Sequence, residues 1–223
     1  TLYSDLGLTK KAIELYQKAM RIYQLDADAN DELIGDVYQN LGVEYQYINA
    51  FEEALAHLQQ ARIIYERQPE VNPEKLAFVA QNIASTLSLQ GNYRASIDES
   101  KAAMGWFRKQ VDSIDFRFEP LLTNMGMDYA AMTRLDSSLQ YHYEALEVLN
   151  HYPDAIMERG NVYSNIGNTY LRMGDYEQAL VAQEEALKGY TGSLGNRHER
   201  VAYALNEMAA TRLKQGLPRQ AFA

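Results

Sequence analysis

Small residues recur along this sequence with a period of about 42 residues, and this repetition constrains the fold more than any other feature. One column places glycine or alanine at Gly42, Ala84, Gly126, Gly167 and Ala209, at intervals of 42, 42, 41 and 42. A second column keeps the same step and consists of Ala19, Ala61, Ala103, Ala145 and Ala186. Two such columns in register indicate a stack of similar units in which each unit contacts its neighbours.

Each unit is predicted to contain two amphipathic helices joined by a tight turn, and residues 161–187 give the clearest copy. From Val162 to Met173, apolar or small residues recur at steps of three and four, which is typical of a helix with one buried face. Gly174 and Asp175 then end this helix. Glycine adopts the left-handed C-cap conformation, and aspartate accepts hydrogen bonds from the first amides of the next helix.

This unit resembles the tetratricopeptide repeat. In that family a small residue in the first helix is followed by an aromatic residue three positions later, and the second helix begins with an aromatic residue and carries alanines. The matching residues here are Gly167, Tyr170, Tyr176, Ala179 and Ala186. Two helices approach closely only where a small residue leaves room, and aromatic rings fill the space around the contact.

The units are longer than the usual repeat of about 34 residues. Roughly eight extra residues would lengthen each of the two helices by about one turn. This longer form is similar to the repeats of kinesin light chain and of bacterial signalling proteins. Residues 193–209 follow the pattern LGxxHPxVAxxLNxLA, except that Glu199 stands where that family has proline.

The resemblance implies an all-α fold, a right-handed superhelix of antiparallel helix pairs that forms one solenoid domain over residues 1–223. We expect residues 1–8 to be the end of a first helix, and residues 218–223 to be the first turn of a second helix. These incomplete ends predict a fragment of a longer array. The expected complete repeats are 31–72, 73–114, 115–155 and 156–196, with partial repeats at 1–30 and 197–223.

Composition narrows the classes of function. The net charge of −9 and the pI near 5.0 disfavour a nucleic-acid partner. No run of 18 apolar residues occurs, so membrane insertion is not expected. The chain has no cysteine, which excludes disulfides and thiolate chemistry. Absence of cysteine fits a reducing compartment, and we expect a cytoplasmic protein.

The residue patterns of enzymes are missing from the sequence. The four histidines, His57, His142, His151 and His198, belong to different repeats and have no metal-ligand spacing, so surface exposure or hydrogen bonding between repeats is expected of them. We find no Walker-type phosphate loop, no dinucleotide-binding glycine motif and no nucleophile elbow. The sequence therefore predicts neither catalysis, nor a metal, nor a cofactor.

The first helix of each unit carries a second stripe that faces away from its partner helix, and we call it the groove stripe. In tetratricopeptide arrays this stripe lines the concave groove. Asparagine is a mediocre helix former, yet it recurs there once per repeat; its carboxamide has a donor and an acceptor that match the backbone of an extended peptide. The predicted peptide-binding residues are Gln39, Asn40, Tyr47, Phe78, Gln81, Asn82, Ser85, Asn124, Asn161, Asn165, Asn168 and Arg172.

Four of these residues, Asn40, Asn82, Asn124 and Asn165, form what we call the asparagine column. Its carboxamides would either contact a peptide or hydrogen-bond to adjacent helices and order the stack. The groove stripe lacks the cluster of lysine and arginine with which related repeats grip a terminal carboxylate, because Arg172 and Lys214 lie a full repeat apart. An acidic C-terminal peptide is therefore a poor candidate ligand.

Several functions fit this sequence. The first is a protein–protein interaction scaffold that binds a peptide or protein segment in the groove, as the regulatory module of a larger bacterial signalling protein with a covalently linked effector domain outside this segment. The alternatives are a sensor receptor for a short signalling peptide, and self-association through the terminal repeats into a homo-oligomer.

Overall fold

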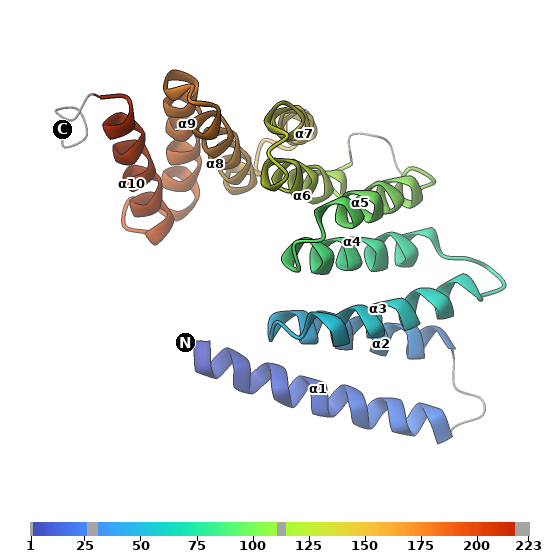
Figure 1. Cartoon of the computed structure of the whole chain (residues 1–223). Helices are drawn as coiled ribbons and strands as arrows, with labels where there is room; N and C mark the ends of the chain where they lie inside the picture. Colours follow the sequence, from blue (N-terminus) through green and yellow to red (C-terminus); the bar gives the residue numbers. More distant parts are fainter. Residues whose placement is uncertain (1, 26–30, 111–114, 217–223) are drawn as a thin grey trace. The chain divides into compact units, whose positions relative to one another are not determined.

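The computed structural model describes residues 2–25, 31–110 and 115–216, and these residues contain ten α-helices and no strand (Figure 1). This confirms the all-α class that the resemblance to the tetratricopeptide repeat implied. In chain order the helices are α1 (Leu2–Leu25), α2 (Asp31–Tyr47), α3 (Phe51–Glu66), α4 (Pro73–Leu89), α5 (Tyr93–Phe107), α6 (Phe118–Ala131), α7 (Leu135–Leu149), α8 (Ile156–Met173), α9 (Tyr176–Leu194) and α10 (Glu199–Lys214).

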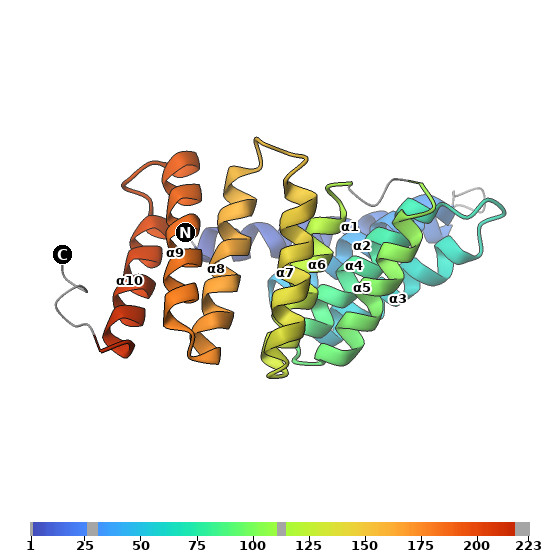
Figure 2. The same cartoon turned by 90° about the horizontal axis from the view of Figure 1, so that it is seen from above.

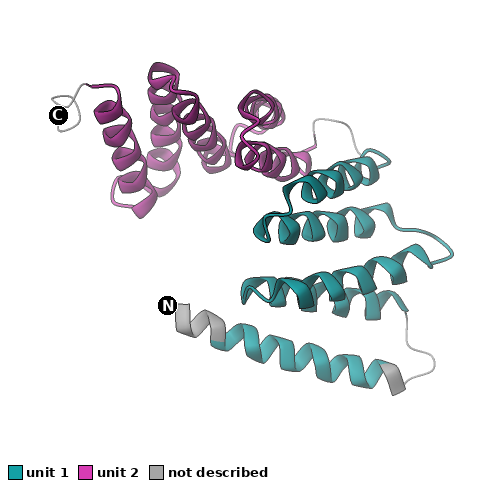
Figure 3. Ribbon diagram, in the orientation of Figure 1, with its two compact units in different colours: residues 1–111 teal, residues 112–223 magenta. Residues whose placement is uncertain are grey.

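The chain divides into two compact units, residues 1–111 and residues 112–223 (Figure 3). Unit 1 contains α1 to α5 and unit 2 contains α6 to α10. The expected single domain over the whole chain, and the expected repeat boundaries, stay predictions. The helical turn expected at residues 218–223 lies outside the described residues.

Within each unit, every helix packs against the helix that follows it in the sequence. The most extensive contacts join α2 with α3 and α4 with α5 in unit 1, and α6 with α7 and α8 with α9 in unit 2. Figure 2 shows α8, α9 and α10 side by side. In addition, α2 touches α4 and α6 touches α8, so the first helices of neighbouring pairs form a layer of their own in each unit.

The two helices of each pair are joined by a turn whose left-handed residue recurs with the sequence period. Gly174 has this conformation and caps α8, and Asp175 Oδ1 then accepts a hydrogen bond of 3.1 Å from the Gln178 amide. This confirms the helix end and the helix start predicted there. The residues with positive φ at the four turns are Asn49, Gly91, Thr133 and Gly174.

Thr133→Gly is expected to raise the free energy of unfolding by about 1 kcal/mol, because a branched Cβ is crowded at positive φ. The φ of Thr133 is 62°. Part of the gain is offset by the greater freedom of glycine in the unfolded chain. Thermal unfolding measures the change, with Asn49→Gly as the matched control, since asparagine tolerates the left-handed region. Equal gains at both positions would contradict the prediction.

The column of small residues lies where the two helices of a pair approach each other most closely. A Cβ on Gly42 would lie 2.5 Å from Leu58 Cγ, and one on Gly126 would lie 2.5 Å from His142 Cε1. In the second alanine column, Ala61 is fully buried. The steric reason predicted for both columns therefore agrees with the packing.

The expected break near residue 8 is wrong, because α1 runs without a turn from Leu2 to Leu25. Gly7 stands one period before Asn49, the left-handed residue of the turn between α2 and α3. A turn of this kind is stabilised when the helices on its two sides pack on each other. A Cβ on Gly7 would have no atom within 4 Å, so no packing holds a turn there and the helix continues.

Candidate functional site

Side-chain bonds near both ends hold the first helices of unit 1, α2 and α4, next to each other. Gln46 Nε2 on α2 donates a hydrogen bond of 2.8 Å to Ser85 Oγ on α4. At the other end, Lys75 Nζ on α4 lies 2.5 Å from Asp36 Oδ1 on α2. Ser85 was predicted to contact a ligand, and here it links two helices. The groove stripes of α2 and α4 are thereby placed on neighbouring helices.

The asparagine column has unpaired carboxamides. Asn40 is exposed, and Asn82, Asn124 and Asn165 are half-buried. None of these four side chains makes a hydrogen bond to another residue in the described part of the chain. The backbone carbonyls of Asn82 and Asn165 do accept bonds, from the hydroxyls of Thr86 and Thr169. The carboxamides themselves therefore remain available to a ligand.

The other predicted polar residues differ in their contacts. Asn161 Oδ1 accepts a hydrogen bond of 2.5 Å from Arg200 Nη1, so this side chain ties α8 to α10. Gln39 Oε1 lies 3.4 Å from the Tyr65 hydroxyl, which is a long contact. The remaining polar members of the predicted site are half-buried or exposed and make no side-chain hydrogen bond to a described residue: Gln81, Asn168 and Arg172.

Two predicted residues add apolar surface beside the asparagine column of unit 1. The Tyr47 side chain at the end of α2 is 71% exposed. Phe78 on α4 is 38% exposed and places its ring edge-on to the buried Phe107, with ring centroids 5.4 Å apart. Unit 1 thus brings together two carboxamides and two partly exposed aromatic rings. The corresponding carboxamides of unit 2 are on α6 and α8.

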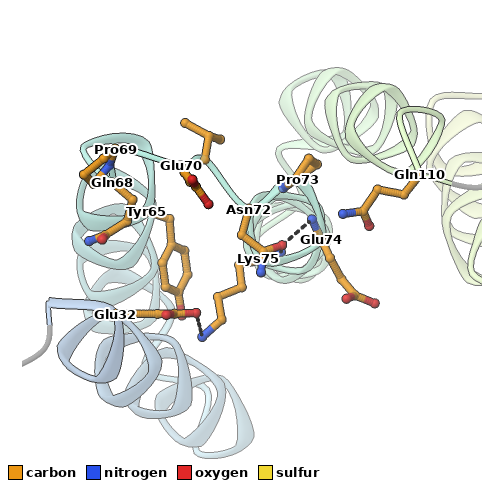
Figure 4. Close-up of a pocket in the computed structure, with 11 residues that line it drawn as sticks. Glu32, Tyr65, Gln68, Pro69, Glu70, Asn72, Pro73, Glu74, Lys75 and Gln110 are labelled. Atoms are coloured by element: carbon orange, nitrogen blue, oxygen red, sulfur yellow. Dashed lines mark hydrogen bonds and ion pairs between the residues drawn. The ribbon is translucent and has the colours of Figure 1, made fainter.

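Unit 1 also has a hollow of about 670 Å³ beside the connection between α3 and α4 (Figure 4). Glu32, Tyr65 and Lys75 line it, and Lys75 Nζ lies 2.9 Å from Glu32 Oε1, as the dashed line shows. The Tyr65 hydroxyl donates a bond of 2.6 Å to Asp36 Oδ1, which also binds Lys75. These charged groups are paired with each other, so we assign the hollow a structural role.

The protonation of this cluster follows from its contacts. Burial and the hydrogen bond to Asp36 raise the pKa of Tyr65, which keeps the phenol neutral. Burial lowers the pKa of Lys75, but its bonds to Asp36 and Glu32 outweigh that effect and raise it. The cluster was missed because no sequence spacing indicates it: Asp36 lies 29 residues before Tyr65 and 39 residues before Lys75.

His142 lies in the interior of unit 2. It is 1% exposed, it packs against Gly126, and its Nδ1 has no hydrogen-bond partner. Burial lowers the pKa of His142 to about 4. Surface exposure or hydrogen bonding between repeats was expected of this histidine, and the expectation is wrong because the ring fills the space that Gly126 leaves open.

The described residues contain no group of three or more histidine, aspartate or glutamate side chains placed to hold a metal ion. None of the described helices is both long enough and apolar enough to cross a membrane.

Comparison with known proteins identifies relatives over almost the whole chain. A model of the tetratricopeptide repeat family matches residues 1–67 and 158–223, more than half of the chain. Protein KINESIN LIGHT CHAIN-RELATED 2 of Arabidopsis thaliana is 24% identical over 227 aligned residues, which cover 96% of this chain. The chain spans 34% of the length of that relative.

Solved structures share the fold. BtubC (BKLC) from P. vanneervenii superposes with a TM-score of 0.77 and 16% identity, over 99% of this chain and 87% of that one. The Rap conjugation gene regulator of the plasmid pLS20, solved in complex with the Phr* peptide, gives a TM-score of 0.66 and 18% identity, over 83% of this chain and 50% of that one. At these identities the likeness establishes the architecture.

Proposed function

The chain belongs to the tetratricopeptide repeat family, and from this premise we propose that it is a non-enzymatic protein-interaction scaffold that binds an extended segment of a partner along the groove stripe. The observation that carries the proposal is the asparagine column, whose four carboxamides have no hydrogen-bond partner among the described residues. Polar side chains at one phase of successive helices, left without partners, are suited to a ligand that brings its own donors and acceptors.

The proposed ligand binds through its main chain. In an extended peptide, backbone N–H and C=O groups alternate, and each carboxamide can pair with one of each. Asn40 and Asn82 lie on neighbouring helices of unit 1, which are held together by the Gln46–Ser85 bond. This bond fixes the spacing of the two carboxamides before a ligand arrives, which reduces the entropy lost on binding.

Partly exposed apolar side chains would select the residues of the partner. Tyr47 and Phe78 offer ring faces in unit 1, and Met127 in unit 2 is 47% exposed. Each of these lies on the groove stripe, close in sequence to a member of the asparagine column. A partner with apolar side chains spaced along an extended backbone fits this surface. Carboxamides would then supply affinity for the backbone, and the apolar residues would supply specificity.

The Rap regulator solved with the Phr* peptide supports the second candidate, a receptor for a short signalling peptide. The same carboxamides would serve such a receptor. We favour the scaffold because the groove stripe is open where it carries Tyr47, which is 71% exposed. A short peptide that binds tightly needs most of its surface enclosed.

We further propose that the segment is a regulatory module of a larger cytoplasmic protein with a linked effector domain. The support is that the chain spans only about a third of the length of the kinesin light chain-related protein that it matches. Sequencing the complete reading frame tests this proposal. Kinase or protease motifs outside the repeats would support it, and repeats alone would contradict it.

Replacing both Asn40 and Asn82 by alanine is expected to weaken peptide binding about thirtyfold, since each side chain contributes roughly 1 kcal/mol through two hydrogen bonds of about 0.5 kcal/mol each. Extended peptides are first selected on wild-type protein from a displayed random library, and their affinities for each variant are then measured by calorimetry. The melting temperature should stay the same or rise slightly, because alanine is the better helix former.

The matched control replaces Gln59 and Gln60, two exposed carboxamides on α3, by alanine. This variant should bind the selected peptides as tightly as wild type does. Unchanged affinity in the Asn40 and Asn82 variant would move the binding site away from the groove stripe. A clear drop in its melting temperature would show instead that the asparagines order the stack.

A further inference from the structure

A basic side chain joins the first helices of two neighbouring pairs near their N-terminal ends. Lys75 Nζ on α4 lies 2.5 Å from Asp36 Oδ1 on α2. In the same way, Arg200 Nη1 on α10 donates a hydrogen bond of 2.5 Å to Asn161 Oδ1 on α8. In both cases the basic residue stands 39 residues after its acceptor. A cation at this position therefore recurs as a link between consecutive first helices.

The contact between α6 and α8 in unit 2 has a carboxylate at this position instead. Glu158 on α8 stands 42 residues before Arg200, so it occupies the equivalent position of its repeat. Glu119 on α6 stands the same 39 residues before Glu158. Because α6 and α8 touch each other, two carboxylates lie where the other repeats pair a base with an oxygen acceptor. We call Glu119 and Glu158 the carboxylate pair.

Glu119 is the buried member of the carboxylate pair. It is 8% exposed, and its Oε1 accepts a hydrogen bond of 2.8 Å from the Thr123 hydroxyl. Its second oxygen, Oε2, has no hydrogen bond to a described residue. Burial raises the pKa of Glu119, the bond from Thr123 partly counters this, and the charge of Glu158 raises the pKa further. A buried carboxylate with an open oxygen and a like charge nearby is suited to a cation from outside the chain.

The two arginines closest in sequence to the carboxylate pair bind other groups. Arg117 Nε lies 2.8 Å from Asp115 Oδ1. Arg159 Nη2 donates a hydrogen bond of 2.8 Å to the carbonyl oxygen of Leu149. Neither member of the carboxylate pair makes an ion pair with a described residue. The neutralising charge that the other repeats supply from within is therefore missing between α6 and α8.

The carboxylate pair lies beside the asparagine column of unit 2. Glu119 precedes Asn124 by five residues on α6, about 7.5 Å along the helix axis. Glu158 precedes Asn165 by seven residues on α8, about 10.5 Å along the axis. A peptide whose backbone is bonded to these two carboxamides would place a neighbouring side chain next to the carboxylate pair.

We propose that the carboxylate pair binds a lysine or arginine side chain of the partner segment, and that this contact sets the specificity of unit 2. The proposal rests on the function proposed above, and it adds the chemistry of one partner residue. A single cationic group can bond two carboxylates, as Lys75 Nζ does with Asp36 Oδ1 and with Glu32 Oε1 at 2.9 Å. The net charge of −9 also favours the approach of a basic segment.

Peptides selected on the wild-type protein from a displayed random library test the proposal. They should share a lysine or arginine at a constant distance from their apolar residues. Replacing this basic residue of a selected peptide by glutamine should weaken its binding to wild type about tenfold or more, as measured by calorimetry. The double variant Glu119→Gln, Glu158→Gln should bind the basic peptide and its glutamine counterpart with equal affinity. Glutamine keeps the size of the side chain and an acceptor for Thr123, and it removes the charge.

The matched control is the double variant Glu147→Gln, Glu184→Gln, which removes two charges from exposed positions of α7 and α9. It should retain the tenfold preference for the basic peptide, and circular dichroism should show the same helicity for all three proteins. Equal binding of the two peptides to wild type, or an unchanged preference in the Glu119 and Glu158 variant, overturns the proposal. If affinity still depends on Asn40 and Asn82 in that case, the proposed function stands. Failure to select any peptide contradicts the proposed function, and this inference with it.

Discussion

Gly189→Ala is expected to lower the free energy of unfolding by about 3 kcal/mol, although alanine is the better helix former. A Cβ on Gly189 would lie 2.8 Å from Gly160 Cα and 2.9 Å from the carbonyl oxygen of Ile156. Both atoms belong to the backbone of α8 and can give way only if α8 moves away from α9. The packing along this pair is among the most extensive in unit 2, so the movement loses contacts over its whole length.

Gly192→Ala is the matched control on the same helix. A Cβ on Gly192 would lie 3.8 Å from Ile156 Cγ2, an ordinary van der Waals contact. This variant should raise the free energy of unfolding by roughly 0.5–1 kcal/mol, because alanine loses less backbone entropy than glycine on folding. Urea unfolding of both variants gives the two values. Changes of the same sign would show that α8 and α9 are not held at the separation that Gly189 requires.

The helix pairs could be predicted from the sequence because steric constraints require the same residue types at equivalent positions of each repeat. Where two helices approach closely, only a small residue fits, and Gly42 against Leu58 is one example. The turn at Gly174 and Asp175 was predictable for a similar reason, since few residues adopt a left-handed C-cap or accept bonds from free helix amides. These requirements are local, and they repeat with the period of the fold.

Features that depend on partners elsewhere in the chain were not predictable in this way. The turn expected at Gly7 is absent. Such a turn is stabilised when the helices before and after it pack on each other, and the residue pattern around Gly7 does not indicate whether they do. Thr133 occupies a left-handed position that its residue type disfavours. The bonds of Tyr65 and Lys75 to Asp36 join three helices, and no spacing rule marks such a cluster.

The helical phase of the candidate site residues could be predicted from the sequence, whereas their hydrogen bonds to other helices could not. Helical phase alone placed the asparagine column on one stripe of the first helices. It did not distinguish side chains that bridge helices from side chains that remain unpaired. Ser85 and Asn161 belong to the first kind, and Asn82 belongs to the second. The difference depends on a donor one repeat away, Gln46 for Ser85 and Arg200 for Asn161.

His142 is expected to make the stability of the protein fall as the pH is lowered from about 6.5 to about 4. Burial lowers the pKa of His142 to about 4, from an ordinary value of 6.5. As the pH falls through 6.5, the unfolded chain takes up this proton first, so protonation favours unfolding. One pKa unit corresponds to about 1.4 kcal/mol, so the loss approaches about 3 kcal/mol near pH 4 and stays constant below it.

The variant His142→Leu isolates this contribution. Leucine is the residue that faces the small column at the same position of an earlier repeat, where Leu58 packs on Gly42. The variant should therefore keep the packing against Gly126 and lose the titrating ring. Chemical denaturation between about pH 7.5 and about pH 3, roughly one unit beyond each end of the titration range, should show wild type losing stability relative to the variant by about 3 kcal/mol. Parallel curves would contradict the prediction, because they would mean that His142 takes up its proton equally readily in the folded and the unfolded chain. Other acids and bases titrate in both proteins, so their contributions cancel in the difference, and the remaining dependence reports the burial of this one ring.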